Sequence, residues 1–249
     1  MMNKKIECTI PEIFPKDKII CGVTHRNIAL FPGTGLSLTK GKLFNDNQLL
    51  EHRKVFAQFL DVKVEQLKFQ KQGHESHIRM IDENSGETES DGMITNIPGL
   101  ILNIGLADCC AVLVFDIKTN SIGAFHSGWR STKENISGKG IIKMKEEFGS
   151  QPENLLIYLS PCASAESYEV GEDLALNFPN NMKPLGHGKY LLDLRGVISN
   201  QLLEFGVMKY NIESSTECTI TNLKYHSYRR DKDKAGRMSA FIGLITNNE

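Results

Sequence analysis

The side chains best suited to catalysis or metal binding are a thiol and an imidazole beside two short apolar runs. The stretch ADCCAVLVFDIKTNSIGAFHSGWR, residues 107–130, places Cys109 before the first run and His126 at the end of the second. Such a pair serves two chemistries: a cysteine nucleophile that a histidine activates, or a metal site in which both are ligands. A catalytic zinc site takes three protein ligands and leaves one position open, and one Cys with two His is a known set.

The third ligand would be a histidine outside this stretch, and the residues alone do not select it. His74 and His77 follow a short predicted strand at Gln66–Phe69. The full set of candidates is His25, His52, His74, His77, His187 and His226. Most histidines in proteins are not ligands, and a free Cys is often simply buried, so the ordinary structural interpretation of each residue stays open.

A hairpin would bring the thiol and the imidazole together. Ala111–Phe115 and Ser121–Phe125 are predicted strands, and the DIKTN segment between them is a short connection. In an antiparallel pair, the start of one strand and the end of the next lie at the same end of the sheet. Cys109 and His126 are therefore expected to be neighbours, whereas Cys110 points to the opposite face.

The other predicted elements mix strands and helices without strict alternation, which favours an α+β fold over a doubly wound one. Further strands are predicted at Leu100–Ile104, Leu155–Leu159 and Ser239–Leu244. Helices are predicted at Leu49–Leu60, Ser131–Phe148 and Leu194–Phe205, the second of them opened by a Ser131–Glu134 capping box. Residues 81–92 are predicted to be a solvated surface loop, and residues 1–249 a single domain.

Composition excludes several classes of partner. Lys plus Arg is 29 and Asp plus Glu is 30, for a net charge of −1, and no basic block predicts nucleic-acid binding. The N-terminal segment lacks the apolar core of a signal peptide, and no apolar run predicts a membrane span. We therefore expect a cytoplasmic protein whose six cysteines are reduced.

Several short motifs occur in an order and spacing that resemble one family. They are Gln72-Gly73-His74, Asp91-Gly92-Met93-Ile94-Thr95, Ala107-Asp108-Cys109, His126-Ser127-Gly128-Trp129-Arg130, Ser160-Pro161-Cys162, Tyr168-Glu169-Val170, Asp193-Leu194, Cys218-Thr219 and Ser227-Tyr228-Arg229-Arg230…Gly236-Arg237. From Gly22 to Leu244 the chain resembles the laccase-domain family, also called the multicopper polyphenol oxidoreductase family. Its bacterial members are also named peptidoglycan editing factors and purine nucleoside phosphorylases.

The resemblance implies a three-ligand metal site of His74, Cys109 and His126 in a mixed α/β sandwich, with central mixed or antiparallel sheets flanked by helices. Family members are similar in binding zinc there, and some are described with copper. The implied activities are phosphorolysis of adenosine, inosine and methylthioadenosine, and deamination of adenosine. Polyphenol oxidation and peptidoglycan editing are further family roles.

Phosphorolysis needs an anion site beside the metal, and the sequence offers one. Arg130 and the helix predicted to start at Ser131 are expected to hold phosphate. The catalytic candidates are Asp108, Cys109 and Arg130, and Asp108 is either a general acid or base or a residue that orients a ligand. Substrate- and phosphate-binding candidates are Arg26, Gln72, Arg130, Glu169, Arg229 and Arg230. The expected partners are a purine nucleoside and phosphate, bound by a monomer or homodimer.

Other chemistries stay open at this stage. A copper-dependent polyphenol oxidoreductase, a peptidoglycan-editing or cell-wall metal-binding protein, and a metal-free Cys109–His126 hydrolase are the alternatives. A true laccase needs several coppers and many more ligands than the seven histidines here. The ordinary zinc deaminase motif is not matched, because no second Cys follows Pro161-Cys162 at the required spacing.

The sequence also departs from the family pattern in three places. The family usually has a Pro two residues after the ligand cysteine, whereas this chain has Cys110-Ala111. The Gly that usually follows the H-x-G-W-R motif is Ser131 here. The N-terminal R-x-G-G-x-S element is reduced to Thr24-His25-Arg26-Asn27.

Overall fold

Two large sheets and one small sheet organise the protein. The computed structural model describes residues 5–40 and 43–246. One sheet has the order β1 (Cys8–Thr9), β2 (Ile19–Thr24), β14 (Met238–Leu244), β6 (Ile101–Leu106), β3 (Leu67–Lys68). The second has the order β13 (Ile212–Ser214), β9 (Leu155–Leu159), β7 (Cys110–Asp116), β8 (Ser121–Ser127), β5 (Gly92–Thr95), β4 (Ile78–Met80). The small sheet has the order β10 (Glu169–Gly171), β12 (Lys189–Leu192), β11 (Met182–Gly186).

Helices and short turns complete the secondary structure. The α-helices are α1 (Asp46–Leu60), α2 (Trp129–Lys133), α3 (Ile136–Phe148), α4 (Glu172–Ala175), α5 (Leu194–Glu204) and α6 (Tyr228–Asp231). Single 3₁₀ turns occur at Val64–Gln66, Pro152–Asn154, Pro179–Asn181, Lys209–Asn211 and Lys232–Lys234. Within the described residues, no helix combines the length and apolar character that a membrane span requires.

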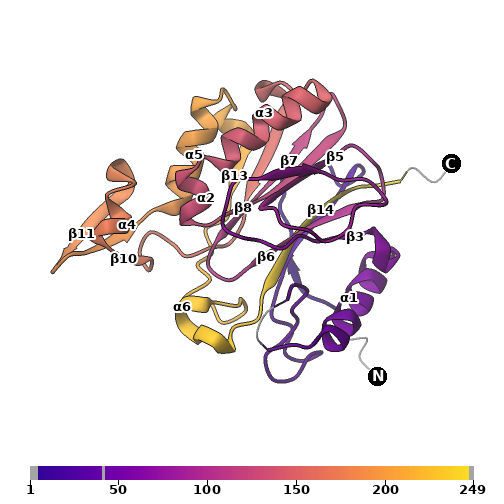
Figure 1. Cartoon of the computed structure of the whole chain (residues 1–249), viewed down its shortest axis with the longest axis horizontal. Helices are drawn as coiled ribbons and strands as arrows, with labels where there is room; N and C mark the ends of the chain where they lie inside the picture. The colour runs from indigo at the N-terminus through magenta and orange to yellow at the C-terminus, as the bar shows by residue number, and fades with distance from the viewer. Residues whose placement is uncertain (1–4, 41–42, 247–249) are drawn as a thin grey trace.

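The two large sheets pack face to face with helices outside them, so the layers run helix, sheet, sheet, helix. Strand β7 shows why: its side chains alternate, so that Leu113 enters the core between the sheets while Val112 enters the core beneath α3 and α5. On the far side, Phe56 of α1 packs edge to face against Phe241 of β14, with ring centroids 5.2 Å apart. Figure 1 shows α3 and α5 on one side of the sandwich and α1 on the other.

This architecture confirms the predicted α+β sandwich of mixed sheets. All six predicted strands form, each within two residues of its predicted bounds. The helices predicted at Leu49–Leu60 and Leu194–Phe205 form as α1 and α5. The sequence did not reveal the small sheet, which projects from the sandwich in Figure 1.

The helix predicted over Ser131–Phe148 is wrong as a single element, because the chain breaks between α2 and α3. Asn135 adopts a left-handed conformation, with φ 57°, and its side chain accepts a hydrogen bond from the Gly138 N–H. Asn tolerates that conformation and caps a new helix, so α3 starts afresh. The predicted capping box is also wrong: α2 begins at Trp129 after Gly128, and Ser131 lies buried inside it.

Replacing Asn135 with alanine is expected to destabilise the protein by about 2 kcal/mol. Alanine cannot accept the hydrogen bond from the Gly138 N–H, and the left-handed conformation is unfavourable for it. Asn135→Gly is the matched control, since glycine tolerates the same backbone and is a fair cap. The free energy of unfolding, measured by urea titration, should fall for alanine and stay near the original value for glycine. Equal losses in both variants would contradict this role of Asn135.

The segment predicted to be a solvated loop is only partly so. Most of residues 82–89 are exposed, but Ser90 and Asp91 are 3% and 1% exposed. Strand β5 begins at Gly92, directly after them. The end of this segment therefore belongs to the interior rather than to the surface.

Candidate metal centre

The β7–β8 hairpin brings Cys109 and His126 to one end of the six-stranded sheet, as predicted. The strands pair antiparallel, with Ala111 opposite His126 and Cys110 opposite Ser127. Because side chains alternate along a strand, Cys109 shares a face with Ala111 and hence with His126. Cys110 faces the other way, into the core beneath the helices.

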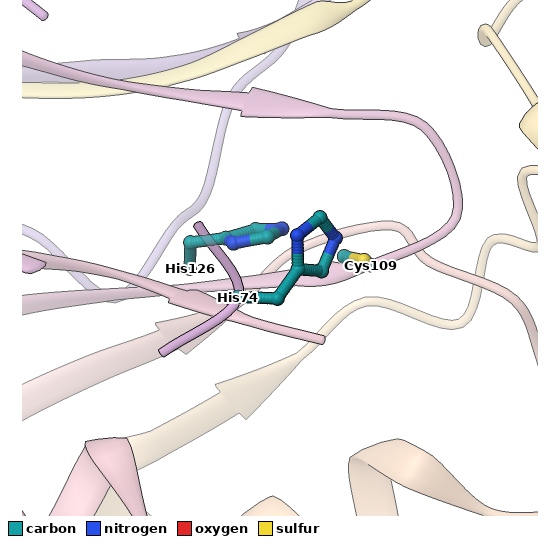
Figure 2. Close-up of side chains that lie close together, drawn as sticks. All are labelled: His74, Cys109 and His126. Carbon is teal, nitrogen blue, oxygen red and sulfur yellow. The ribbon is translucent and has the colours of Figure 1, made fainter. Parts of the chain in front are cut away.

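His74 completes the group from a loop between β3 and β4. Its backbone is left-handed, with φ 63°, which turns the imidazole toward the hairpin. The nitrogen and sulfur ligand atoms of His74, Cys109 and His126 all lie within 4.8 Å of one another, and Figure 2 shows the three side chains converging. The two imidazoles meet edge to face, with ring centroids 4.8 Å apart.

Asp91 fixes the tautomer of His126. The Nδ1 atom of His126 lies 2.7 Å from Asp91 Oδ1. An ionised carboxylate only accepts hydrogen bonds, so Nδ1 carries a proton, and Nε2 is the nitrogen that binds a cation once its own proton leaves. Burial raises the pKa of Asp91, but the bonds from His126 and from the Glu75 and His74 N–H groups lower it more, and the pKa lies below its usual value.

The thiol and the imidazole form a charged pair before any cation binds. Burial raises the pKa of Cys109, but His126 and His74 lower it more strongly, to about 6. Burial lowers the pKa of His126, whereas Cys109 and Asp91 raise it to about 9. A thiolate held next to two imidazoles is the form in which cysteine binds metal or acts as a nucleophile.

The three residues fit a small thiophilic cation. Tetrahedral zinc places sulfur and nitrogen ligands about 3.3–3.6 Å apart, so donors within 4.8 Å of one another can share one ion. Gly128 shapes the space beside them: a Cβ there would lie 3.0 Å from Cys109 Sγ and 3.1 Å from His74 Cδ2. Among residues 5–40 and 43–246, this is the one group of three or more such donors.

Substituting Gly128 with alanine is expected to lower zinc affinity by about 10-fold or more, because overpacking a tight site costs about 1–3 kcal/mol. Chelator competition measures the affinity. Gly86→Ala is the control, since a Cβ at Gly86 meets nothing within 4 Å. Wild-type affinity in the Gly128 variant would show that the ligands do not depend on this space.

The group opens onto a cavity of about 1020 Å³ that contains several other predicted site residues. The described lining includes Gln72, Asp108, Arg130 and Arg229 beside the three metal-site residues. Arg130 is exposed, and its guanidinium lies 4.3 Å from the centroid of the Trp129 ring.

Asp108 and Gln72 form hydrogen bonds with segments that surround the cavity. Asp108 accepts hydrogen bonds from the Thr219 hydroxyl at 2.7 Å and the Arg229 N–H at 2.6 Å. Both carboxylate oxygens of Asp108 therefore accept from residues outside the group of His74, Cys109 and His126. The Gln72 amide exchanges two hydrogen bonds with the backbone of Gly105, which fixes the loop that carries His74.

Three predicted substrate residues lie outside the described lining of this cavity. Arg26 lines a separate cavity of about 600 Å³, and the Glu169 carboxylate pairs with Lys189 at 3.2 Å. Arg230 donates to the Asp231 carboxylate and to the carbonyls of Thr219, Ile220 and Tyr225. The structure therefore does not bring these three side chains to the metal centre.

Sequence reasoning missed the roles of Asp91, Gly128 and Tyr168 at the centre. Asp91 ends a polar segment and precedes a glycine, which is also the pattern of an exposed turn. Tyr168 lines the cavity, and burial together with the nearby Cys109 raises its pKa to about 12, so the phenol stays protonated. Only the family-like motifs around these residues signalled them.

Comparisons with known proteins found a matching family model, related proteins and similar solved structures. A family model described as multi-copper polyphenol oxidoreductase laccase matches residues 21–245. A Deinococcus radiodurans protein named purine nucleoside phosphorylase is 35% identical over 165 residues, 64% of this chain and 63% of that protein, which is just under two thirds of its length. A Clostridium acetobutylicum protein of the same name is 35% identical over 186 residues, 72% of this chain and 77% of that protein. The crystal structure of a Bacillus licheniformis hypothetical protein, YfiH, has a TM-score of 0.84 at 25% identity, covering 91% of this chain and 92% of that one.

Proposed function

Because the chain belongs to the multi-copper polyphenol oxidoreductase laccase family, we propose that it is a purine nucleoside phosphorylase with a metal ion held by His74, Cys109 and His126. Adenosine, inosine and methylthioadenosine are the proposed substrates, with deamination of adenosine as a side activity. The observation that carries the proposal is the His–Cys–His group at the wall of a cavity that is also lined by Arg130, whose guanidinium has no acceptor among the described residues. The names of the related proteins support the same activity.

The residues around the cavity suit the bonds that change in phosphorolysis. The bond between the sugar C1′ and the purine nitrogen breaks, and a phosphate oxygen bonds to C1′. Arg130 has no acceptor for its guanidinium within residues 5–40 and 43–246, so it is the residue we assign to phosphate. Arg229 lines the same cavity and is steadied by a 2.7 Å bond to the Glu169 carbonyl.

Two aromatic side chains supply surface for the purine. Trp129 and Tyr168 both line the cavity, and flat rings pack well against a heterocyclic base. The protonated Tyr168 phenol can donate a hydrogen bond to the substrate. Zinc, when bound, supplies Lewis-acid catalysis and activates water. We favour zinc because one thiolate and two imidazoles are a known set of catalytic zinc ligands.

The family description favours copper-dependent polyphenol oxidation as the second candidate. A multi-copper site requires several ligand groups, whereas the described part of the chain gathers one. Oxygen consumption by copper-loaded protein with a phenol tests this candidate. A metal-free Cys109–His126 hydrolase is the third, and activity that survives complete removal of metal would identify it.

The proposal is tested by the products formed from adenosine. Zinc-loaded protein is incubated with adenosine, with and without phosphate, and the products are separated by chromatography. Adenine that forms only with phosphate is the expected result. Inosine without a phosphate requirement would make deamination the main reaction. No turnover by the metal-loaded protein would contradict the proposal and make cell-wall fragments the next substrates to test.

A further inference from the structure

Asp91 contacts both histidines of the metal centre although they come from separate segments. Its carboxylate is 1% exposed and is absent from the described cavity lining. One oxygen, Oδ1, accepts from His126 Nδ1 at 2.7 Å and from the His74 N–H at 3.0 Å. The other, Oδ2, accepts from the N–H groups of Gly73 at 3.0 Å and Glu75 at 2.8 Å. Four donors therefore converge on one buried carboxylate.

The loop around His74 is shaped to enclose that carboxylate. Three successive N–H groups, from Gly73 to Glu75, point at it, and the left-handed backbone of His74 forms the bend. Successive N–H groups in such a bend form a concave anion-binding nest. A left-handed conformation is unfavourable for a residue with a Cβ. The hydrogen bonds of the nest stabilise this conformation at His74.

On the hairpin side, Asp91 holds His126 at two points. The ring donates from Nδ1 to the carboxylate, and the His126 N–H donates to the Asp91 carbonyl at 2.7 Å. The Asp91 N–H in turn donates to the carbonyl of His77, on the far side of the His74 loop. The aspartate thus ties the loop and the hairpin into one unit.

We propose that Asp91 is the positioning residue of the metal centre, and that it holds His74 and His126 in ligating geometry before a cation arrives. It is not an acid or base for the reaction, because it does not reach the cavity and its lone pairs are filled by four donors. This inference rests on the proposed metal centre, but it does not depend on which reaction the centre catalyses.

The first test compares Asp91→Asn with Asp116→Asn. Asparagine replaces one acceptor oxygen by an NH₂ group, so two of the four donors lose their acceptor whichever way the amide faces. Asp116 is a matched control: it is buried at the other end of β7, and its Oδ1 accepts from the Lys118 and Thr119 N–H groups. Both variants are titrated with Zn²⁺ against a chelator and with Co²⁺, whose thiolate absorption reports the ligand geometry.

We expect Asp91→Asn to lose about 10- to 100-fold in Zn²⁺ affinity and to change the Co²⁺ spectrum, while Asp116→Asn retains both. Wild-type affinity and spectrum in Asp91→Asn would overturn the proposal. Equal losses in both variants would overturn it as well, because they would show a general effect of removing a buried carboxylate.

A second test uses the wild-type chain, so it stands even if Asp91→Asn does not fold. Amide hydrogen exchange and histidine ¹⁵N NMR are measured on zinc-loaded and on chelator-treated protein. We expect the amides of residues 73–75 to be protected in both states, and His126 to stay protonated on Nδ1. Protection that appears only with zinc, or zinc bound at Nδ1, would overturn the proposal. Absence of nucleoside turnover with these results intact would contradict the proposed reaction alone.

Discussion

Cys109→Ala is expected to remove stoichiometric metal and to lower kcat/KM for phosphorolysis by about 10³-fold or more. The thiolate is the one anionic donor of the group, and its loss leaves two imidazoles. Lewis-acid stabilisation by a metal contributes several kcal/mol, and about 4 kcal/mol corresponds to about 10³-fold in rate. Metal content by elemental analysis and adenine release with saturating phosphate measure the two effects.

Cys110→Ala is the matched control for this prediction. The two cysteines are neighbours in sequence, but Cys110 is buried in the core beneath the helices and faces away from the centre. Its removal should lower stability slightly and leave metal content unchanged. Retention of metal by Cys109→Ala, or its loss from Cys110→Ala, would show that the wrong thiol has been assigned.

Arg130→Ala should raise KM for phosphate by about 10- to 100-fold while changing KM for adenosine little. The guanidinium lines the cavity and is stacked on Trp129, and hydrogen bonds to a charged group contribute about 1.5–3 kcal/mol. Initial rates measured over a range of phosphate concentrations at saturating adenosine give the KM for phosphate.

Lys133→Ala serves as the control for Arg130, since it removes the same charge from an exposed position on the same short helix. Lys133 is absent from the described lining of the cavity. Its phosphate dependence should stay close to that of the unaltered protein. An equal rise in the KM for phosphate in both variants would show an effect of overall charge. An unchanged KM for phosphate in Arg130→Ala would show that this arginine does not bind phosphate.

The β7–β8 hairpin could be predicted because the apolar runs of the sequence and the short turn between them indicate the same strand pairing. Two apolar runs with a polar turn between them permit few pairings, and the observed pairing of Ala111 with His126 follows from the short turn. Once that pairing holds, strand alternation alone places Cys109 on the face of His126. His74, in contrast, reached the site only through the family resemblance, because no local pattern links its loop to the hairpin.

The features that escaped prediction depend on contacts distant in sequence. Asp91 ends a polar segment, and its burial is decided by the N–H groups of the His74 loop and by His126. Asn135 follows the end of α2 and caps the start of α3 with a left-handed backbone, which the apolar spacing of the sequence does not reveal. Arg230 resembled an anion ligand in the sequence, yet its guanidinium is used by Asp231 and nearby carbonyls.

The most direct test of a metal-dependent phosphorylase follows inorganic phosphate by phosphorus NMR in the presence of adenosine. The same preparation is measured after chelator treatment and after zinc reconstitution. We predict a new sugar-phosphate signal, matched by released adenine, only in the reconstituted sample. Equal turnover after chelation, or no sugar phosphate from protein that carries stoichiometric zinc, would contradict the proposed function.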